Sequence, residues 1–474
     1  MNKKKLILLL TGLVCLAAFV LVNVLFGLLP VSSTRLDATQ GNLLTPSEAL
    51  TQAAQAVDTP VTIYYVSAQE NIDPLLETLV NDVSRQNDNI TVKQLITGTA
   101  ADDIVSRYAS DGLSDNSLIV TSDLRSYVIE NEELISVVYN ETYLYYYNQY
   151  VVDSQEYFAD SLLAFALDYT TRQDVPVLYQ LTGHGETALG ATAFELLARR
   201  YVEVRNLSLL QEGTVPEDAQ ALIINGPTAD ISVAESEALL AYLQAGGKLL
   251  LMTSYDKAEL SNLSKVTEYY GMQAQDGLVQ DPKVGYHYSD SSAAYNYYIR
   301  PDVAQTGALA ELAADEALSL CIPQSHALTL SAVTRDTLTV ETLMTTSEEA
   351  YLKSNLTQMT TLDQEDGDVV GVFDLAMTAS EGDTRLVWLA NIQALSDNSI
   401  GLSSYNGQMF TSLLAWMQVQ MPEEQQLTGV NLLLNALEVG SANTPVIKGL
   451  FIALPVFMLL IGLIACRKEK KPSR

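Results

Sequence analysis

Short apolar runs that alternate with helical segments constrain the fold of this chain more than any other feature. Between residues 173 and 252, the runs "VPVLYQL", "AQALIINGP" and "KLLLM" are separated by "TALGATAFELLARR" and "SVAESEALLAYLQAGG". Apolar runs of this length are typical of strands buried on both faces, and the segments between them have the length of crossover helices. This alternation predicts an α/β fold with a mostly parallel sheet covered by helices.

Capping signals mark the helix boundaries within this pattern. Ser232 followed by Glu235 has the spacing of a capping box, in which each side chain bonds the backbone N–H of the other residue. Thr45 followed by Glu48 predicts a second capping box near the start of the chain. Residues 271–300, rich in Gly, Asp, Ser and Tyr, predict a long loop instead.

Two apolar segments near the ends of the chain predict transmembrane helices. Residues 6–29 would extend roughly 36 Å as a helix, longer than the apolar region of a usual signal peptide, and residues 448–466 are a second such segment. Basic residues precede the first segment and follow the second, which predicts a plasma-membrane protein with both termini cytoplasmic and a large extracytoplasmic domain. The predicted organisation is a cytoplasmic tail (1–5), a transmembrane helix (6–29), a first α/β unit (30–172), a second α/β unit (173–425), a juxtamembrane linker (426–447), a transmembrane helix (448–466) and a basic cytoplasmic tail (467–474).

The charge balance and the cysteines exclude several classes of site. The chain carries 26 Lys and Arg against 57 Asp and Glu, for a net charge of −31. Such an excess of acid excludes nucleic acid as a partner. Cys321 is the only cysteine between the two apolar segments, so no intrachain disulfide and no Cys-rich metal site is expected there. Cys321 itself is expected to pack in a core.

The segment "LTGHGE" holds the candidate site, because it follows the first buried strand of the second unit. In open α/β sheets, ligands bind beyond the carboxyl ends of the strands. The candidate contacts for a ligand or partner are Gly183, His184, Gly185, Glu186 and Asn225. The simpler alternative is a structural turn, in which the glycines adopt positive φ and Glu186 caps the amides of the following helix.

Two enzymatic interpretations of this segment are weaker. Gly183, Gly185 and Ala188 satisfy the dinucleotide pattern G-x-G-x-x-A, and Glu203 has the spacing of a ribose-binding acid. A hydrolase would use His184 and Glu186 as base and orienting acid, yet no serine or cysteine stands in a nucleophile elbow. We therefore predict no catalytic residue and no cofactor.

Metal binding is not predicted either. The three histidines share no H-E-x-x-H or C-x-x-C spacing. The acidic segment "DQEDGD" (363–368) lacks the glycine position of an EF-hand loop, which favours a hairpin turn over a calcium site. ATP hydrolysis is excluded because "AGGKLL" lacks the spacing and the hydroxyl residue of a P-loop.

Tyrosines are concentrated in "YNETYLYYYNQY" (139–150) and again in "YHYSDSSAAYNYYIR" (286–300). Tyrosine combines a large contact area with a polar tip, so it is common at protein interfaces and at sugar sites. An ordinary tyrosine-rich strand or hairpin is the alternative. The candidate interface residues are Tyr143, Tyr145, Tyr146, Tyr147 and Tyr150.

The order of several segments resembles a known family. After the first apolar segment come "TRLDATQGNLLTPSEAL", "PVTIYYVSA", "PVLYQLTGHGE", "DAQALIINGPTADIS", "LLAYLQAGGKLLLM" and "LMTTSEEAY", and then the second apolar segment. Together they resemble the GldG-like, gliding-motility-type auxiliary proteins of ABC transporters. The resemblance implies a glutamine-amidotransferase-like second unit without amidotransferase activity. It also implies an ABC permease subunit and a cytoplasmic ATPase subunit as partners.

The predicted function is a non-catalytic, membrane-anchored auxiliary subunit of an ABC transport system. Its extracytoplasmic domain would brace or gate a permease, or receive cargo such as a sugar or a peptide. The alternative is a stand-alone receptor or sensor of the cell envelope that captures a ligand in a crevice at His184. An envelope hydrolase is a third and weaker alternative.

Overall fold

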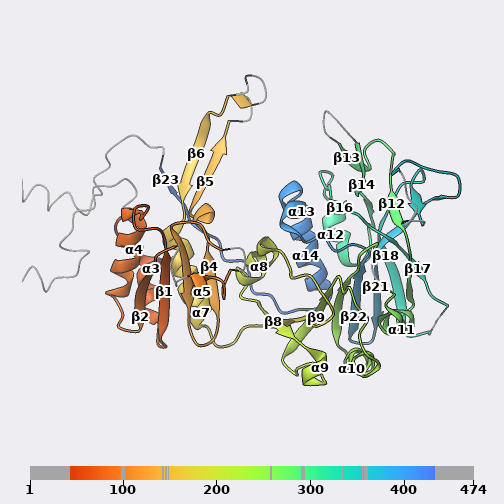
Figure 1. Cartoon of the computed structure of the whole chain (residues 1–474), viewed down its shortest axis with the longest axis horizontal. Helices are drawn as coiled ribbons and strands as arrows, with labels where there is room; N and C mark the ends of the chain where they lie inside the picture. Colours follow the sequence, from red (N-terminus) through yellow and green to blue (C-terminus); the bar gives the residue numbers. More distant parts are fainter. Residues whose placement is uncertain are drawn as a thin grey trace, which may run out of the picture. The chain divides into compact units, whose positions relative to one another are not determined.

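The chain forms two compact units, which are described separately. The computed structural model describes residues 43–97, 102–109, 112–140, 143–144, 147, 149–256, 259–289, 294–332, 335–354, 356 and 361–432. Unit 1 comprises the residues up to Gln173 together with those from Gln426 onward, and unit 2 comprises Asp174–Gln425. Both units combine helices with β-sheets (Figure 1), which confirms the predicted α/β class.

Unit 1 is built on a four-stranded sheet in the order β2-β1-β3-β4. Its strands are β1 (Val61–Val66), β2 (Ile90–Leu95), β3 (Ser117–Thr121) and β4 (Ser126–Ile129). Strand β1 pairs in parallel with β2 and antiparallel with β3, and β3 pairs antiparallel with β4. The helices of the unit are α3 (Glu48–Ala56), α4 (Pro74–Ser84), α5 (Asp102–Val105) and α7 (Ala159–Thr171).

Helix α3 begins differently from the prediction. Ser47, and not Thr45, is the N-cap residue, and its hydroxyl accepts the N–H of Leu50 at 3.1 Å. The Ser47 N–H in turn donates to Asp160 Oδ2 of α7 at 2.9 Å. This contact with a helix more than a hundred residues away fixes the backbone at Ser47, and the local spacing of Thr45 and Glu48 contains no information about it.

A second sheet of unit 1 has the order β23-β6-β5. It consists of β5 (Ile135–Tyr139), β6 (Val152–Tyr157) and the short β23 (Val430–Asn431), and the 3-10 helix η2 (Asn131–Leu134) precedes β5. Strands β5 and β6 pair antiparallel and extend away from the four-stranded sheet (Figure 1). We call β5 and β6 together the hairpin arm.

Five parallel strands form one side of the main sheet of unit 2. Along the sheet their order is β8-β7-β9-β10-β22, and each adjacent pair is parallel. The strands are β7 (Val177–Leu181), β8 (Glu203–Leu207), β9 (Ala219–Asn225), β10 (Lys248–Met252) and β22 (Thr384–Leu389). Numbered by their sequence within this parallel set, the order is 2-1-3-4-5, as in flavodoxin-like sheets.

Helices cover both faces of this sheet, and the strand side chains alternate between two cores. One core joins Leu178 and Ile223 to side chains of α8 (Ala191–Ala198) and α14 (Tyr405–Trp416). The other core contains residues of α9 (Leu209–Glu212), α10 (Val233–Gln244) and α11 (Ser261–Tyr269). The helix after β7 and the helix after β9 therefore lie on opposite faces.

Antiparallel strands make the main sheet mixed rather than mostly parallel. The sheet continues from β22 through β21 (Asp374–Glu381), β17 (Ala327–Leu330) and β11 (Met272–Gln275), and β18 (Thr339–Thr345) pairs with β21 and with β15 (Asp302–Val303). Two small sheets contain β12 (Leu278–Gln280), β19 (Tyr351–Lys353) and β20 (Val369–Val370), and β13 (His287–Ser289), β14 (Ala294–Ile299) and β16 (Ile322–Pro323). The remaining short helices are η3 (Gly307–Leu309), α12 (Ala310–Ala313) and α13 (Asp397–Leu402).

The prediction of a long loop over residues 271–300 is wrong. Strands β11, β12, β13 and β14 lie within this stretch. Strands β11 and β12 pair with β17 and β19, which follow much later in the chain. The partners that stabilise these short strands are therefore distant in sequence, and a local hydrophobic pattern does not reveal them.

The predicted location, a plasma-membrane protein with two spans, is corrected by the structure. In the part of the chain that the structure describes, no helix has the length and apolar character needed to cross a membrane. The two segments predicted as spans, residues 6–29 and 448–466, lie outside the described residues.

Candidate functional site

The "GHGE" loop lies at the topological switch point of the parallel sheet. It follows the carboxyl end of β7, and the loop after β9 is its neighbour because β7 and β9 are adjacent strands. The helices that follow these two strands pack on opposite faces of the sheet. At such a position the two loops diverge, and it is there that open α/β proteins bind ligands.

The two loops are joined by backbone contacts. The N–H groups of Thr228 and Ala229 both donate to the His184 carbonyl oxygen at 2.9 Å. The Thr187 N–H donates to the Asn225 carbonyl oxygen at 2.8 Å, and the Asn225 side-chain amide donates to the Thr187 carbonyl oxygen at 3.0 Å. The loop after β7 is thus bonded both to the end of β9 and to the loop that follows β9.

Glycine is required at one position of this loop for two reasons. Gly185 has a φ of +77°, in the left-handed region that residues with a Cβ rarely adopt. A Cβ at Gly185 would also lie 2.0 Å from the Thr228 hydroxyl oxygen. Gly183 has a φ of +120° with open space around it, so there only the backbone conformation favours glycine.

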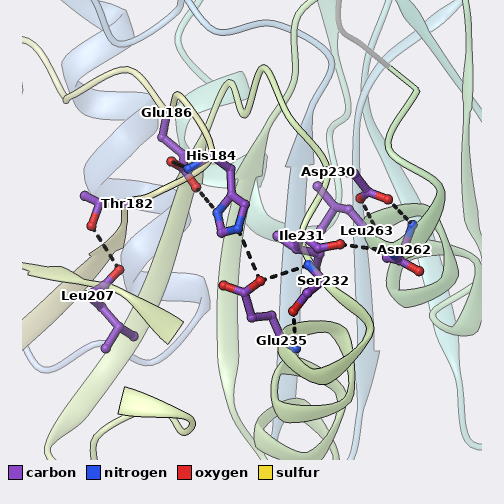
Figure 2. A network of polar contacts seen from close by, with 10 residues as sticks. All are labelled: Thr182, His184, Glu186, Leu207, Asp230, Ile231, Ser232, Glu235, Asn262 and Leu263. Atoms are coloured by element: carbon purple, nitrogen blue, oxygen red, sulfur yellow. Dashed lines mark hydrogen bonds and ion pairs between the residues drawn. The ribbon is translucent and has the colours of Figure 1, made fainter. Parts of the chain in front are cut away.

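His184 bridges two buried carboxylates, as Figure 2 shows. Its Nδ1 lies 3.1 Å from Glu186 Oε1, and its Nε2 lies 3.2 Å from Glu235 Oε2. The side chains are exposed to 10% for His184, 1% for Glu186 and 4% for Glu235. Ionised carboxylates only accept hydrogen bonds, so the doubly protonated imidazolium is the form that donates to both.

Glu186 does not cap a helix, which corrects the structural alternative considered for this loop. One of its carboxylate oxygens accepts the N–H of His184 at 2.7 Å, and the other faces the His184 ring. The first amides of α8, those of Ala191 and Thr192, donate instead to the carboxylate of Asp397. Asp397 begins α13 and is more than two hundred residues away in sequence.

Glu235 joins the histidine to the start of α10. Its Oε2 accepts the N–H of Ser232 at 2.8 Å, and its own N–H donates to Ser232 Oγ at 3.3 Å, which confirms the predicted capping box. Burial raises the pKa of Glu235, but bonds from Ser232 and the charge of His184 outweigh burial and leave that pKa below its ordinary value of 4.5. Among the described residues, Glu235 Oε1 is buried without a hydrogen-bond partner.

The loop after β9 is also fixed on its far side. Asp230 accepts the N–H groups of Asn262 and Leu263 at the start of α11, at 2.8 and 3.2 Å, and the Asn262 side chain donates to the Ile231 carbonyl oxygen at 2.8 Å (Figure 2). One network therefore links the loop after β7 to α10 and α11.

The lowered pKa of Glu235 predicts a specific dependence of stability on pH. Because this pKa is lower in the folded protein than in the unfolded chain, the stabilisation is complete above about pH 4.5 and is lost as the pH falls below it. Glu235→Gln is expected to flatten the loss of stability on acidification, measured by urea unfolding at a series of pH values. Glu237→Gln, at an exposed position of the same helix, is the control and should keep the wild-type slope. Equal slopes for all three proteins would contradict the assignment.

The structure brings together the five candidate contact residues and shows what the sequence interpretation missed. Gly183, His184, Gly185 and Glu186 form one side of the network, and Asn225 closes it through Thr187. Glu235 and Thr228 are not among the predicted contacts. The capping-box spacing identifies Glu235 only as a helix cap, and no local signal pairs it with His184.

The dinucleotide interpretation is excluded by the strand geometry. Glu203 is the first residue of β8 and pairs with Val177 at the amino end of β7. Gly183 and Gly185 follow the opposite, carboxyl end of β7. Glu203 also forms a two-pronged ion pair with Arg205, with both contacts at 2.8 Å. It therefore lies at the wrong end of the sheet to bind a ribose next to the glycines.

The other candidate reactive groups, Cys321 and the acidic segment 363–368, have structural roles. Cys321 is fully buried, and burial raises its pKa to about 11, so the predicted core position is confirmed. The acidic segment 363–368 lies around the buried ammonium of Lys353, which contacts the Asp363 carbonyl oxygen, Glu365 and Asp368 at 2.6 to 3.1 Å. Among the described residues, no group of three or more His, Cys, Asp and Glu side chains is arranged to hold a metal ion.

The tyrosines that the structure describes in the segment 139–150 lie in β5 or between β5 and β6. Tyr143, Tyr147 and Tyr150 are exposed to 45%, 64% and 71%. Their rings form edge-on or tilted pairs, Tyr139 with Tyr150 and Tyr143 with Tyr147. The other two candidate interface residues, Tyr145 and Tyr146, lie outside the described residues.

Comparisons with known proteins agree with one part of the sequence analysis. Residues 176–370 match the model of a family described as an ABC-type uncharacterized transport system. No curated protein matches the chain.

Solved structures share limited similarity with this chain. They include the N-terminal domain of mmIFT52, at 16% identity and a TM-score of 0.37, covering 52% of this chain and 98% of that one. The β-galactosidase from Rahnella sp. R3 has 14% identity and a TM-score of 0.30, covering 55% of this chain and 34% of that one. PurLQS from Thermotoga maritima has 11% identity and a TM-score of 0.29, covering 52% of this chain and all of that one. Likeness this low carries no information about function.

The family match covers the five candidate contact residues and most of the main sheet of unit 2. It confirms the predicted relation to ABC-transporter auxiliary proteins, whereas the narrower gliding-motility type stays a prediction. Residues 176–370 of this chain are therefore similar to a family of auxiliary proteins of ABC transport systems.

Proposed function

We propose that this protein is a non-catalytic auxiliary subunit of an ABC transport system, which braces or gates the permease subunit or receives its cargo. The observation that carries the proposal is the match of residues 176–370 to an ABC transport family. The family match implies association with an ABC transporter. The permease subunit and the ATPase subunit are the proposed partners, and a sugar or a peptide is the proposed cargo.

The geometry at the switch point supports a non-catalytic role. His184, the side chain best suited to act as a base, has both ring nitrogens directed at buried carboxylates. The helix amides that would stabilise an oxyanion are bonded to Asp397. Apart from Asn225 Oδ1 and Glu235 Oε1, these groups bond to one another, which favours a structural connection between the two loops over a reactive centre.

Quantitative mass spectrometry of the proteins that co-purify with the tagged full chain tests this proposal. A permease and a nucleotide-binding ATPase in stoichiometric amounts are expected, and an untagged strain controls for background. Since this chain lacks a P-loop, the ATPase must be a separate polypeptide. A protein that purifies alone, in a detergent that preserves other ABC complexes of the same cell, would contradict the proposal.

A stand-alone receptor is a second candidate, and one observation favours it. Asn225 Oδ1 and Glu235 Oε1 are buried polar atoms without a hydrogen-bond partner among the described residues. Both belong to the network at the switch point, where a polar ligand would find them. Equilibrium dialysis of the chain against mixtures of sugars and short peptides tests this candidate, with Asn225→Ala as the variant expected to lose binding. Retention of no compound by the wild-type chain would eliminate it.

A further inference from the structure

The hairpin arm of unit 1 exposes an unusual amount of apolar surface. All five residues of β5 are exposed, including Ile135 at 40%, Val137 at 36% and Tyr139 at 40%. Side chains alternate along a strand, so these three share one face of the arm. Opposite Tyr139 on β6 is Val152, exposed to 37%, and the ring of Tyr150 packs edge-on against Tyr139. Contiguous exposed apolar surface of this kind marks interaction sites.

Strand β5 also has a free edge. In the part of the chain that the structure describes, its only strand neighbour is β6. Leu134 and Asn140, the residues on either side of β5, both bond toward the β6 strand: the Leu134 carbonyl oxygen accepts the Phe158 N–H, and the Asn140 N–H donates to the Val151 carbonyl oxygen. Backbone groups alternate in direction along a strand, so the even-numbered residues of β5 bond toward β6 as well. The N–H and C=O groups of Ile135, Val137 and Tyr139 therefore point away from β6. Among the described residues, Ile135, Val137 and Tyr139 therefore combine exposed apolar side chains with backbone groups that are directed away from β6.

The charge of the arm selects the kind of partner. From residue 126 to residue 171 the sequence contains no Lys, Arg or His. Five described acidic residues lie on or beside the arm, namely Glu130, Glu132, Glu133, Asp153 and Glu156. Glu156 faces Ser136 across the hairpin, one residue from Val137. An occupant of the β5 edge would therefore gain from Lys or Arg side chains placed among apolar ones.

We propose that the edge of β5 binds an extended, basic segment of the permease subunit, which adds to the arm as a further strand. This inference rests on the proposed function for the identity of the partner. Backbone hydrogen bonds to Ile135, Val137 and Tyr139 give the contact its register, and the apolar side chains of the segment cover the exposed face. A second copy of this chain is disfavoured as the occupant, because two such arms would bring acidic residues together without any base between them.

A proline at Val137 tests the edge without disturbing the hairpin. The Val137 N–H points away from β6, so Val137→Pro removes an outward donor but no bond between β5 and β6. Val137→Thr is the matched control, since it keeps the N–H and the preference for a strand. The probe is a short synthetic peptide of alternating Lys and Val, and fluorescence anisotropy measures its binding to the full chain. Hydrogen exchange of the Ile135–Tyr139 amides locates the binding site.

The expected result is slower exchange of these amides with the peptide bound, and binding that is at least about tenfold weaker for Val137→Pro than for Val137→Thr. A peptide of alternating Glu and Val should bind much more weakly than the Lys peptide. Equal binding by the two variants would show that the acidic chain attracts the basic peptide non-specifically, and the inference would be wrong. A dimer of the free chain that Val137→Pro dissociates would likewise overturn it, in favour of a second copy as the occupant.

Co-purification separates this inference from the proposed function. If the wild-type chain brings down the permease, Val137→Pro should reduce its recovery at least about tenfold, while Val137→Thr retains most of it. Recovery that is unchanged by the proline would overturn the arm as the docking site and leave the proposed function intact. If the wild-type chain brings down no permease, the proposed function fails together with the permease as the partner, and the peptide experiment still decides whether the β5 edge accepts a basic strand.

Discussion

Replacing His184 with alanine is expected to lower the free energy of unfolding of unit 2 by about 2–4 kcal/mol. The substitution leaves two buried carboxylates, those of Glu186 and Glu235, without the imidazole ring that contacts both of them. Backbone N–H groups of His184 and Ser232 still bond to the two carboxylates, so the expected loss is below that for a fully isolated charge. Urea unfolding followed by tryptophan fluorescence measures the effect, because both tryptophans, Trp388 and Trp416, belong to unit 2.

The control for this substitution is His287→Ala. The His287 ring is half-buried, and its Nδ1 bonds to the Asp281 carbonyl oxygen at 2.9 Å. His287→Ala is expected to lower the free energy of unfolding by about 1 kcal/mol or less. His184→Gln, which keeps one donor, should fall between the wild type and His184→Ala. If His184→Ala unfolds at the same urea concentration as the wild type, His184 does not stabilise the loop, and ligand contact at the switch point becomes the better interpretation.

Gly185→Ala is expected to destabilise unit 2 to a similar extent, by about 2–4 kcal/mol. Part of this cost is the left-handed backbone at a φ of +77°, and the rest is the collision of the new Cβ with the Thr228 hydroxyl, which would lie 2.0 Å away. Gly213→Ala separates the two contributions. Gly213 has nearly the same φ, +73°, and no atom lies within 4 Å of the place that its new methyl group would occupy, so only about 1 kcal/mol is expected there.

A second substitution tests the collision directly. Thr228→Ala removes the hydroxyl that the Gly185 methyl would meet, at the cost of the 3.3 Å hydrogen bond from that hydroxyl to the His184 carbonyl oxygen. The double variant should be more stable than the sum of the two single effects predicts, by about 1–3 kcal/mol. Strict additivity would mean that the loop moves away from the β9 loop to accept the methyl group, and that the two loops are not rigidly joined.

Local sequence signals locate many of the elements correctly. The run "VPVLYQL" contains β7, "AQALIINGP" contains β9, and "KLLLM" coincides with β10. A strand buried on both faces needs a continuous apolar run, and that requirement is local. The capping box of Ser232 and Glu235 is local as well, since both residues lie in one helical turn.

Predictions fail where a distant segment decides the outcome. The sequence pattern predicts helix α8 from residue 187, but the helix begins at Ala191, because the preceding residues bond to the end of β9 and Asp397 caps the helix. For residues 271–300 the sequence predicts a loop, whereas strands β11, β12, β13 and β14 lie there. Their pairing, such as β11 with β17, joins segments about fifty residues apart in sequence.

The sequence by itself determined the α/β class, strands β7, β9 and β10, the capping box of α10 and the position of the "GHGE" loop at a strand end. Each of these depends on residues within a few positions of one another. Only the tertiary structure decided that His184 lies between Glu186 and Glu235, the latter 51 residues away. The strand order 2-1-3-4-5 makes β7 and β9 neighbours and turns the following helices to opposite faces, and no pattern within either segment encodes that order.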